Sequence, residues 1–309
     1  MGDRADLQHR RRTDHPVMSD IRVGFIGLGN MGAPMAQRLL AWPGGLTVCD
    51  TRAEAVAPFT DAGAEAADSA AAVAERAEIV SVAVLDDAQV RAVVTGPDGV
   101  LSTARPGTVI AVHATIADST AEDLAAVCAE REVALVDAPV SGGAPGANSG
   151  RLAVMVGGTE TAFERVREPF GCFADLVVHA GPVGAGTRMK LARNLLHFVA
   201  FTAATEAQRL AEAAGLDITA LGKVVRHSDA VTGGPGAIML RERTGPIADG
   251  DFWSPILAHV RDLGEKDLGL ALGLGERLGL DLPLARLALR DLGAGLGVGP
   301  GAVAEGRTP

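Results

Sequence analysis

The stretch that decides the fold runs from residue 26 to residue 40 and reads IGLGNMGAPMAQRLL. Gly27, Gly29 and Gly32 have the spacing G-x-G-x-x-G, directly after a predicted strand and at the start of a predicted helix. In such a turn the first glycine bends the chain, the second admits a pyrophosphate close to the backbone, and the third lets the helix pack on the strand. The amides at the helix start then face the phosphates. The stretch therefore predicts a dinucleotide-binding turn.

The choice of dinucleotide depends on the end of the second predicted strand. Asp50 lies there, 23 residues after Gly27, close to the roughly 20 residues expected for an acid that binds the adenosine ribose. Its carboxylate would repel the additional phosphate of NADP. Arg52, two residues later, could instead pair with that phosphate. We weigh Asp50 more heavily and expect NAD to be favoured over NADP.

Around this turn, short apolar runs alternate with alanine-rich amphipathic stretches as far as residue 181. Such alternation is typical of an α/β Rossmann domain with a parallel, doubly wound sheet covered on both faces. We expect strands at residues 22–26, 46–49, 79–84, 108–112, 134–137, 152–156 and 176–179. We expect helices at residues 31–41, 52–63, 69–76, 87–94, 119–130 and 159–170.

Beyond residue 181 the strand patterns stop and helical patterns take over, the longest of them at residues 187–214. At 1.5 Å per residue this helix would be about 42 Å long, enough to join two domains. Apolar residues on more than one of its faces favour a homodimer or homotetramer. The predicted organisation is a flexible N-terminal tail at 1–20, a Rossmann domain at 21–182, an all-helical domain at 183–292 and a flexible tail at 293–309.

Composition excludes several classes of function. The 309 residues carry a formal net charge of −10, which argues against nucleic acid as a partner because phosphate binding requires a basic surface. No uninterrupted apolar run has the roughly 20 residues of a membrane span. The three cysteines lie far apart in the sequence, which indicates a reducing cytoplasm and neither a disulfide framework nor a metal site. The chain has no tyrosine, so a tyrosine hydroxyl cannot serve as its proton donor.

Two later segments could supply chemistry. Ser141, Gly142 and Gly143 follow a predicted strand, where a hydroxyl and unhindered amides could cradle a carboxylate; an ordinary surface loop is the alternative. Lys190 and Asn194 are four residues apart in the long helix and project from one face of it. A lysine in this place could be a surface group with a covered stem. Partial burial would instead lower its pKa toward neutrality and make it a usable proton carrier.

With these motifs the chain resembles the β-hydroxyacid dehydrogenase family, which includes 3-hydroxyisobutyrate, tartronate semialdehyde and 6-phosphogluconate dehydrogenases. The resemblance rests on GLGNMGAPMA at 27–36, DAPVSGG at 137–143, GAGTRMKLARN at 184–194 and KDLGLAL at 266–272. It implies an NAD(P)-dependent enzyme that interconverts a small β-hydroxy acid and its semialdehyde or keto acid. It also implies an active site in a cleft between the Rossmann domain and the helical domain.

The resemblance implies roles for single residues. Lys190 would be the catalytic acid/base, and Ser141, Gly142, Gly143 and Asn194 would bind the substrate. The cofactor would be bound by Gly27, Leu28, Gly29, Asn30, Met31, Gly32, Asp50, Arg52, Leu85, Thr115 and Lys266. Two positions depart from the family pattern. Ala114 stands where the family usually has serine, and Arg193 stands where it commonly has a second asparagine.

Two other functions stay open at this point. The first is an imine reductase, which resembles the same fold but often has Asp or Tyr in place of the lysine. The second is a non-catalytic dinucleotide-binding protein, which would lack that lysine. Lys190 disfavours both alternatives.

Overall fold

The computed structural model describes residues 21–239, 241, 245–248 and 250–301. The chain forms two compact units, residues 1–192 and 193–309. The boundary lies inside the long helix α8 (Ala185–Ala213), later than the boundary after residue 182 that the sequence predicts. The reason is that the start of α8 is hydrogen-bonded to the sheet of the first unit, through the carboxylate of Asp137. The predicted tail at residues 1–20 lies outside the described residues.

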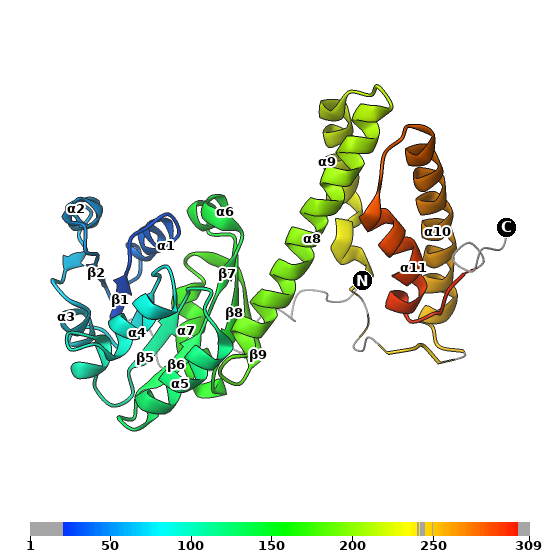
Figure 1. Cartoon of the computed structure of the whole chain (residues 1–309). Helices are drawn as coiled ribbons and strands as arrows, with labels where there is room; N and C mark the ends of the chain where they lie inside the picture. Colours follow the sequence, from blue (N-terminus) through cyan, green and yellow to red (C-terminus); the bar gives the residue numbers. More distant parts are fainter. Residues whose placement is uncertain (1–20, 240, 242–244, 249, 302–309) are drawn as a thin grey trace, which may run out of the picture. The chain divides into compact units, whose positions relative to one another are not determined.

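The first unit is built on a sheet of nine strands in the order β3-β2-β1-β4-β5-β6-β8-β7, with β9 paired to β8 (Figure 1). The strands are β1 (Val23–Ile26), β2 (Leu46–Cys49), β3 (Glu65–Ala66), β4 (Ile79–Val82), β5 (Val109–Val112), β6 (Ala134–Asp137), β7 (Val140–Ser141), β8 (Leu152–Gly157) and β9 (Ala174–Gly181). The short strands β3 and β7 are absent from the sequence prediction, because two residues leave no apolar run to detect.

The sheet is mostly parallel. From β3 to β6 every neighbouring pair is parallel. At the other edge β8 runs antiparallel to β6 and to β7 and parallel to β9. The predicted parallel, doubly wound sheet is thus confirmed in its main part, and the antiparallel pairing of β8 at this edge is an addition to it. The connection from β7 to β8 is a single short helix, and a short connection suits antiparallel neighbours, whereas parallel neighbours need a longer crossover.

Helices cover both faces of the sheet, because successive strand residues point to opposite sides. In β5, Val109 and Ala111 belong to the apolar core on one face, while Ile110 and Val112 belong to the core on the other. Residues of α1, α6 and α7 fill the first core, and residues of α3, α4 and α5 fill the second. The helices of this unit are α1 (Gly32–Leu39), α2 (Ala53–Asp61), α3 (Ala70–Ala74), α4 (Asp87–Thr95), α5 (Asp118–Ala129), α6 (Gly143–Ser149) and α7 (Glu160–Phe170).

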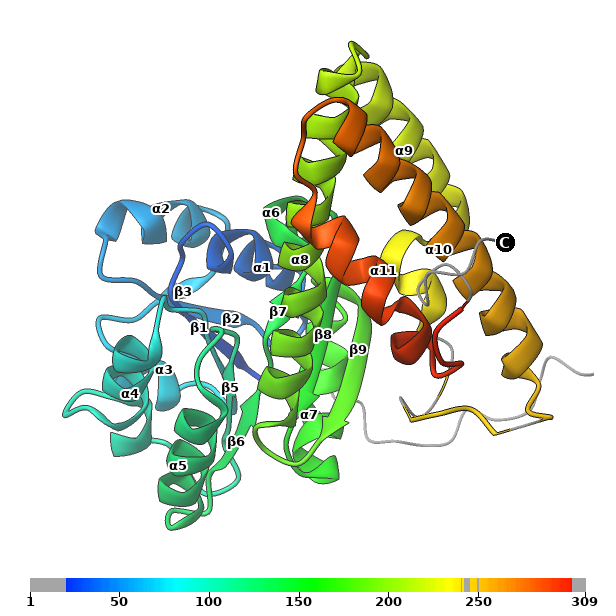
Figure 2. The ribbon, with the colours of Figure 1, turned by 45° about the vertical axis from the view of Figure 1, so that its right-hand side comes forward.

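The second unit is all-helical in its described part. It holds most of α8 together with α9 (Ile218–Thr232), α10 (Trp253–Arg277) and α11 (Pro283–Leu296). Figure 2 shows α10 and α11 side by side, and they approach closely because Gly264 faces the side chain of Leu292. The carboxylate of Glu206 on α8 accepts hydrogen bonds from the N–H groups of Leu284 (2.7 Å) and Ala285 (3.0 Å). These bonds tie the start of α11 to α8.

The fold continues past residue 293, where the sequence predicts a flexible tail. Helix α11 ends at Leu296, whose side chain is buried. The N–H group of Gly301 donates to the buried carboxylate of Glu265 (2.8 Å), and Arg261 donates to the carbonyl of Val298 (3.1 Å). These two side chains of α10 hold the segment in place, which the glycine-rich sequence alone does not indicate. Residues 302–309 lie outside the described part. Within the described residues, no helix is long and apolar enough to cross a membrane.

Candidate functional site

Most of the residues predicted to bind cofactor or substrate lie at one edge of the sheet in the first unit. The glycine turn follows β1, Asp50 follows β2, Leu85 lies beyond β4 and Thr115 lies beyond β5. Because these strands are parallel and adjacent, their carboxyl ends meet at the same edge. Ligands of open α/β sheets bind at this edge, where the strand order reverses. The reversal here lies between β1 and β4.

The three glycines of the turn have different surroundings. Gly27 has a φ of 93°, which side chains rarely adopt, and a methyl group there would meet the carbonyl of Ala83. A methyl group on Gly32 would collide with the carbonyl oxygen of Gly27, so that α1 can approach the turn only with glycine at this position. Gly29 has no atom within 4 Å of the place where a methyl group would be. The open space at Gly29 fits the approach of a pyrophosphate to the backbone.

The carboxylate of Asp50 is fixed in place by the turn. It accepts hydrogen bonds from the backbone N–H groups of Leu28 (2.6 Å) and Arg52 (2.9 Å). The guanidinium of Arg52 also donates to it (3.2 Å). Partial burial acts to raise the pKa of Asp50, but these hydrogen bonds outweigh it and hold the pKa below its ordinary value. An ionised acceptor therefore stands at the end of β2, and the charge of Arg52 is directed to it.

Leu85 and Thr115 are both exposed at this edge, Leu85 to 79%. The backbone N–H of Leu85 donates to the Gln89 side chain (3.0 Å), which orients the turn after β4. Ala114, the departure from the usual serine, is buried in the core on the side of α4 and α5.

His113, next to this segment, has a structural role. It is 5% exposed, and its ring contacts the carbonyl of Ala138 (2.8 Å) and the hydroxyl of Ser81 (3.0 Å). It also packs against Phe25, Phe170 and Phe173. Desolvation in this apolar setting lowers its pKa to about 4. The ring is therefore neutral at pH 7 and links β4, β5 and the chain after β6.

The segment predicted to cradle a carboxylate is a strand followed by a helix. Ser141 lies in β7 and Gly143 begins α6. Gly142 and Gly143 have φ values of 128° and 64°, which favour glycine at both positions. Both glycines are exposed. The alternative of an ordinary surface loop is therefore wrong in its secondary structure, because the run from Gly143 forms helical turns in spite of its glycine and proline content.

Lys190 contacts this same segment. Its Nζ donates a hydrogen bond to the carbonyl of Val140 (2.6 Å), next to Ser141. Asn194 lies one turn further along α8, where Arg193 donates to its side-chain oxygen (3.3 Å). Lys266 lies on α10, where it is exposed and forms an ion pair with Asp267 (3.2 Å). The described contacts thus bring Lys190 to the residues after β6, whereas Asn194 and Lys266 belong to the second unit.

Asp137 is a residue of this region to which the sequence prediction gives no role. It ends β6 and is fully buried, and its carboxylate accepts hydrogen bonds from the N–H groups of Gly184 (2.7 Å) and Thr187 (2.6 Å). Burial raises the pKa of Asp137, against the effect of these two N–H groups, which lower it. The available signal was a lone acid at the end of an apolar strand. Its partners are 47 and 50 residues away in the sequence and could not be recognised from it.

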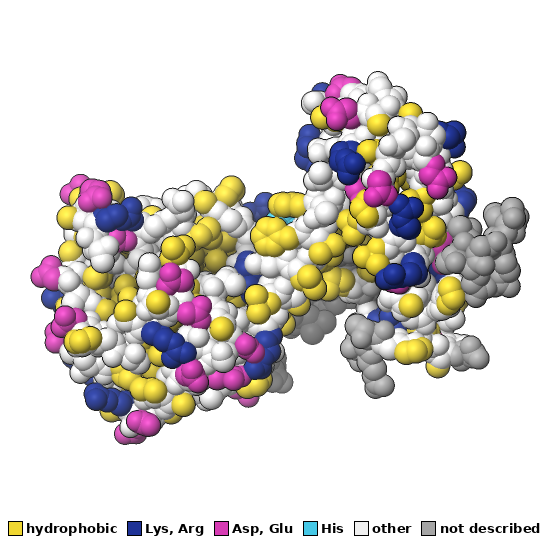
Figure 3. All heavy atoms as spheres, in the orientation of Figure 1, with side chains coloured by type: hydrophobic (Ala, Val, Ile, Leu, Met, Phe, Trp, Pro, Cys, Tyr) yellow, Lys and Arg dark blue, Asp and Glu magenta, His cyan; other side chains and the backbone are white. Residues whose placement is uncertain are grey.

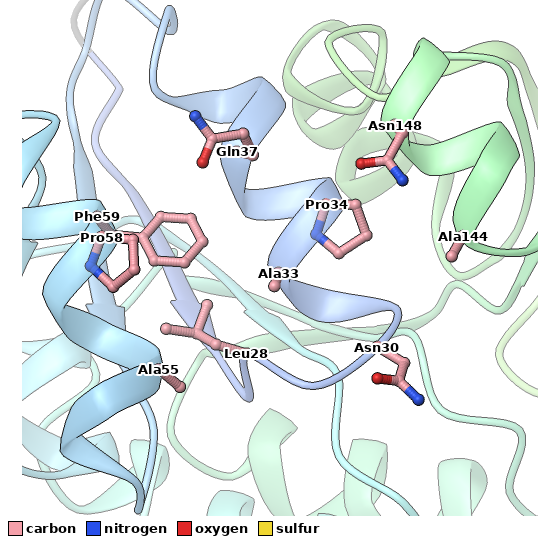
Figure 4. A pocket seen from close by; sticks show the side chains of 10 residues that line it. All are labelled: Leu28, Asn30, Ala33, Pro34, Gln37, Ala55, Pro58, Phe59, Ala144 and Asn148. Atoms are coloured by element: carbon pink, nitrogen blue, oxygen red, sulfur yellow. The ribbon is translucent and has the colours of Figure 1, made fainter.

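A groove of about 430 Å³ lies beside the glycine turn. Figure 4 shows it along α1, between α2 and α6. Leu28 and Asn30 of the turn line it, as do Gln37 of α1, Phe59 of α2 and Asn148 of α6. None of the residues predicted to bind substrate or carry the proton lines this groove, but Ala144, which directly follows Gly143, does.

Two protein-family models match the chain. One is the NAD binding domain of 6-phosphogluconate dehydrogenase, at residues 22–181. The other, described as NAD-binding of NADP-dependent 3-hydroxyisobutyrate dehydrogenase, matches residues 184–295. Together they span most of the described residues.

Similar proteins extend over nearly the whole chain. An uncharacterized oxidoreductase of Mycobacterium tuberculosis is 60% identical over 93% of this chain and 96% of its own length. The 2-(hydroxymethyl)glutarate dehydrogenase of Eubacterium barkeri is 34% identical over 91% of each chain. A crystal structure of a Mycobacterium avium protein is 56% identical, with a TM-score of 0.87 over 91% of this chain and all of that one. Solved imine reductases, such as one from Myxococcus stipitatus at 18% identity and a TM-score of 0.69, share the fold.

Proposed function

Because the chain belongs to the β-hydroxyacid dehydrogenase family of NAD(P)-dependent oxidoreductases, we propose that it interconverts a small β-hydroxy acid and its semialdehyde or keto acid, with Lys190 as acid/base. The observation that carries this proposal is the hydrogen bond from the Lys190 amine to the carbonyl of Val140. That bond holds the amine next to Ser141, Gly142 and Gly143, which we propose as the substrate carboxylate site.

The geometry suits a short substrate. In a β-hydroxy acid only one carbon separates the carbinol carbon from the carboxylate carbon, so a single small molecule could reach both the exposed glycines and the lysine. Lys190, in its neutral form, would accept the hydroxyl proton during oxidation and return it during reduction. During reduction the protonated, charged form of Lys190 would stabilise the developing alkoxide. The nicotinamide supplies the two-electron acceptor when bound. Asn194, one turn along α8, would orient the substrate.

We propose NAD as the preferred cofactor. The turn residues Gly27 to Gly32 would hold the pyrophosphate, and Asp50 would accept hydrogen bonds from the ribose hydroxyls. Asp50 is kept ionised by its hydrogen bonds, and a fixed negative charge there opposes a second phosphate. Arg52, the group that could favour NADP, already donates to this carboxylate. Leu85, Thr115 and Lys266 complete the proposed cofactor contacts.

The test is NADH formation, followed at 340 nm, with a panel of substrates. The panel contains 3-hydroxyisobutyrate and 2-(hydroxymethyl)glutarate. In both compounds a hydroxymethyl group and a carboxylate are attached to the same carbon atom. Cyclic imines are offered with NADH or NADPH in the reverse direction. Turnover of imines with none of hydroxy acids would favour the imine reductase alternative, and cofactor binding without turnover of any of them would favour a non-catalytic binding protein.

A lysine variant then assigns the proton carrier. Lys190→Ala should lower kcat by about a hundredfold or more, with NADH binding retained. Lys223→Ala, at an exposed position of α9, is the matched control and should leave kcat unchanged. Near-normal turnover by Lys190→Ala would contradict the assignment.

We also propose that the protein is a homo-oligomer, assembled through α8. Leu195, Phe198 and Phe201 on this helix are 69%, 60% and 56% exposed, and Figure 3 shows hydrophobic side chains gathered over it. A second copy of the chain would cover them, as expected for a large exposed apolar surface.

A cytoplasmic location suits the free thiols of Cys49, Cys128 and Cys172.

A further inference from the structure

Asp137 is a buried carboxylate that the proposed chemistry leaves without a role. It caps the start of α8 by accepting hydrogen bonds from the N–H groups of Gly184 and Thr187. The first four N–H groups of an α-helix have no acceptor within the helix. The positive end of the helix dipole also favours a negative charge at this position. Asp137, at the end of strand β6, thus accepts hydrogen bonds that a residue directly before the helix in the sequence usually accepts.

The backbone around this carboxylate is packed without intervening side chains. A methyl group on Gly157 of β8 would collide with the Asp137 carboxylate, and one on Gly186 of α8 would collide with the Asp137 carbonyl oxygen. The ends of β6 and β8 and the first turn of α8 therefore touch directly. The place of this helix start is set by two independent constraints, the close backbone packing and the buried hydrogen bonds.

The same short segment also contacts Lys190. Val140, three residues after Asp137, accepts the hydrogen bond from the lysine amine. Lys190 itself lies three residues after Thr187 on α8, about 4.5 Å further along the helix axis. The segment from Asp137 to Val140 therefore holds α8 at two points, first through the carboxylate and then through the lysine.

We propose that Asp137 is a positioning residue for the reaction, because it fixes the first turn of α8 to the end of β6 and so places the Lys190 amine beside Ser141. This inference rests on the proposed function, since it requires Lys190 to carry the proton. Contacts on the outer side of the same turn are weaker. Arg188 forms ion pairs with Asp118 and Glu122 of α5, but all three side chains are substantially exposed, where such pairs contribute little.

The test is Asp137→Asn, which keeps the size of the side chain. It replaces one of the two acceptor oxygens by an NH₂ group, which cannot accept a hydrogen bond from the N–H groups of Gly184 or Thr187. A displaced amine should lower kcat by about 10- to 100-fold, the scale expected for small misplacements of a catalytic group. The KM values for NAD and the hydroxy acid should change less than about threefold, because this variant leaves the binding residues in place. The solvent deuterium isotope effect on kcat should rise, because proton transfer becomes slower relative to the other steps.

The isotope effect separates positioning from a merely structural role. A less stable enzyme has fewer active molecules, which lowers the apparent kcat but changes neither KM nor the isotope effect. Glu206→Gln is the matched control, because Glu206 caps the start of α11 in the second unit through the same kind of hydrogen bonds. It should lower the melting temperature as Asp137→Asn does, with the wild-type isotope effect and with the wild-type kcat per folded molecule.

Wild-type kcat and isotope effect in Asp137→Asn would overturn the inference, as would the same rise in isotope effect in Glu206→Gln. If Asp137→Asn does not fold, Asp137→Ser keeps a short acceptor at the end of β6 but removes the charge and the second oxygen that cap α8. It should lower kcat by about tenfold or more, with a rise in the isotope effect; an unchanged isotope effect would overturn the inference. Near-normal turnover by Lys190→Ala would refute the proposed function itself. Loss of turnover in that variant, together with wild-type behaviour of Asp137→Asn, would refute only the positioning role.

Discussion

The burial of His113 predicts that the first unit loses stability in mild acid. Its ring is neutral in the folded protein, where desolvation lowers the pKa from 6.5 to about 4. The unfolded chain, in which the ordinary pKa returns, binds a proton at higher pH than the folded one. The folded state therefore has its full stability above pH 6.5 and loses it as the pH falls from 6.5 toward 4.

The magnitude follows from the two pKa values. The difference between 6.5 and about 4, at about 1.4 kcal/mol per pKa unit, corresponds to about 3 kcal/mol at pH values well below 4. Between pH 7.5 and pH 5 the same two values give about 2 kcal/mol. This range lies mostly above the ordinary pKa values of carboxylates, so that the histidine contribution can be measured with little interference.

The assay is urea unfolding at pH 7.5 and pH 5.0, followed by the fluorescence of Trp42, which lies in the core of the same unit. A Trp253→Phe background removes the signal of the second unit. His113→Gln keeps a polar side chain at this position, but glutamine does not titrate. When the pH is lowered from 7.5 to 5.0, the variant should therefore lose about 2 kcal/mol less free energy of unfolding than the parent. His227→Gln, at an exposed position of α9, should fall as the parent does. Equal losses in parent and His113→Gln would refute the reasoning.

Three further predictions concern the glycine turn, the cofactor and the assembly. Gly32→Ala should lower the free energy of unfolding by about 1–3 kcal/mol, because its methyl group would collide with the Gly27 carbonyl. Gly29→Ala places its methyl group in open space. It should therefore keep the wild-type melting temperature but raise the KM for NAD. Comparable KM values for the two variants would contradict this. Asp50→Ala should lower the ratio of kcat/KM with NAD to kcat/KM with NADP by about tenfold or more, because charge-assisted hydrogen bonds to NAD are lost. An unchanged ratio in the 340 nm assay would show that Asp50 does not select the cofactor. Phe198→Glu should shift the protein to a smaller assembly in light scattering, and an unchanged mass would exclude that part of α8 from an interface.

Much of the fold could be predicted because its signals are local. The spacing of Gly27, Gly29 and Gly32, with Asp50 at the end of the next strand, depends on a turn and a strand that are contiguous in the sequence. The strand at residues 46–49 and the helix of 29 residues that carries Lys190 were predicted to within two residues at each end. Apolar periodicity indicates such elements directly, because it reflects which side of each element faces a core.

What the tertiary structure alone decided are the contacts between residues far apart in the sequence. The antiparallel placement of β8, the burial of His113 between β4 and the chain after β6, and the capping of α8 by Asp137 all depend on sheet order. A run of residues encodes its own turn or helix, but not the strand that will lie beside it. From the sequence alone, Asp137 therefore cannot be distinguished from any acid at the end of a strand. Its role as a cap depends on the tertiary structure, which places the start of α8 against it.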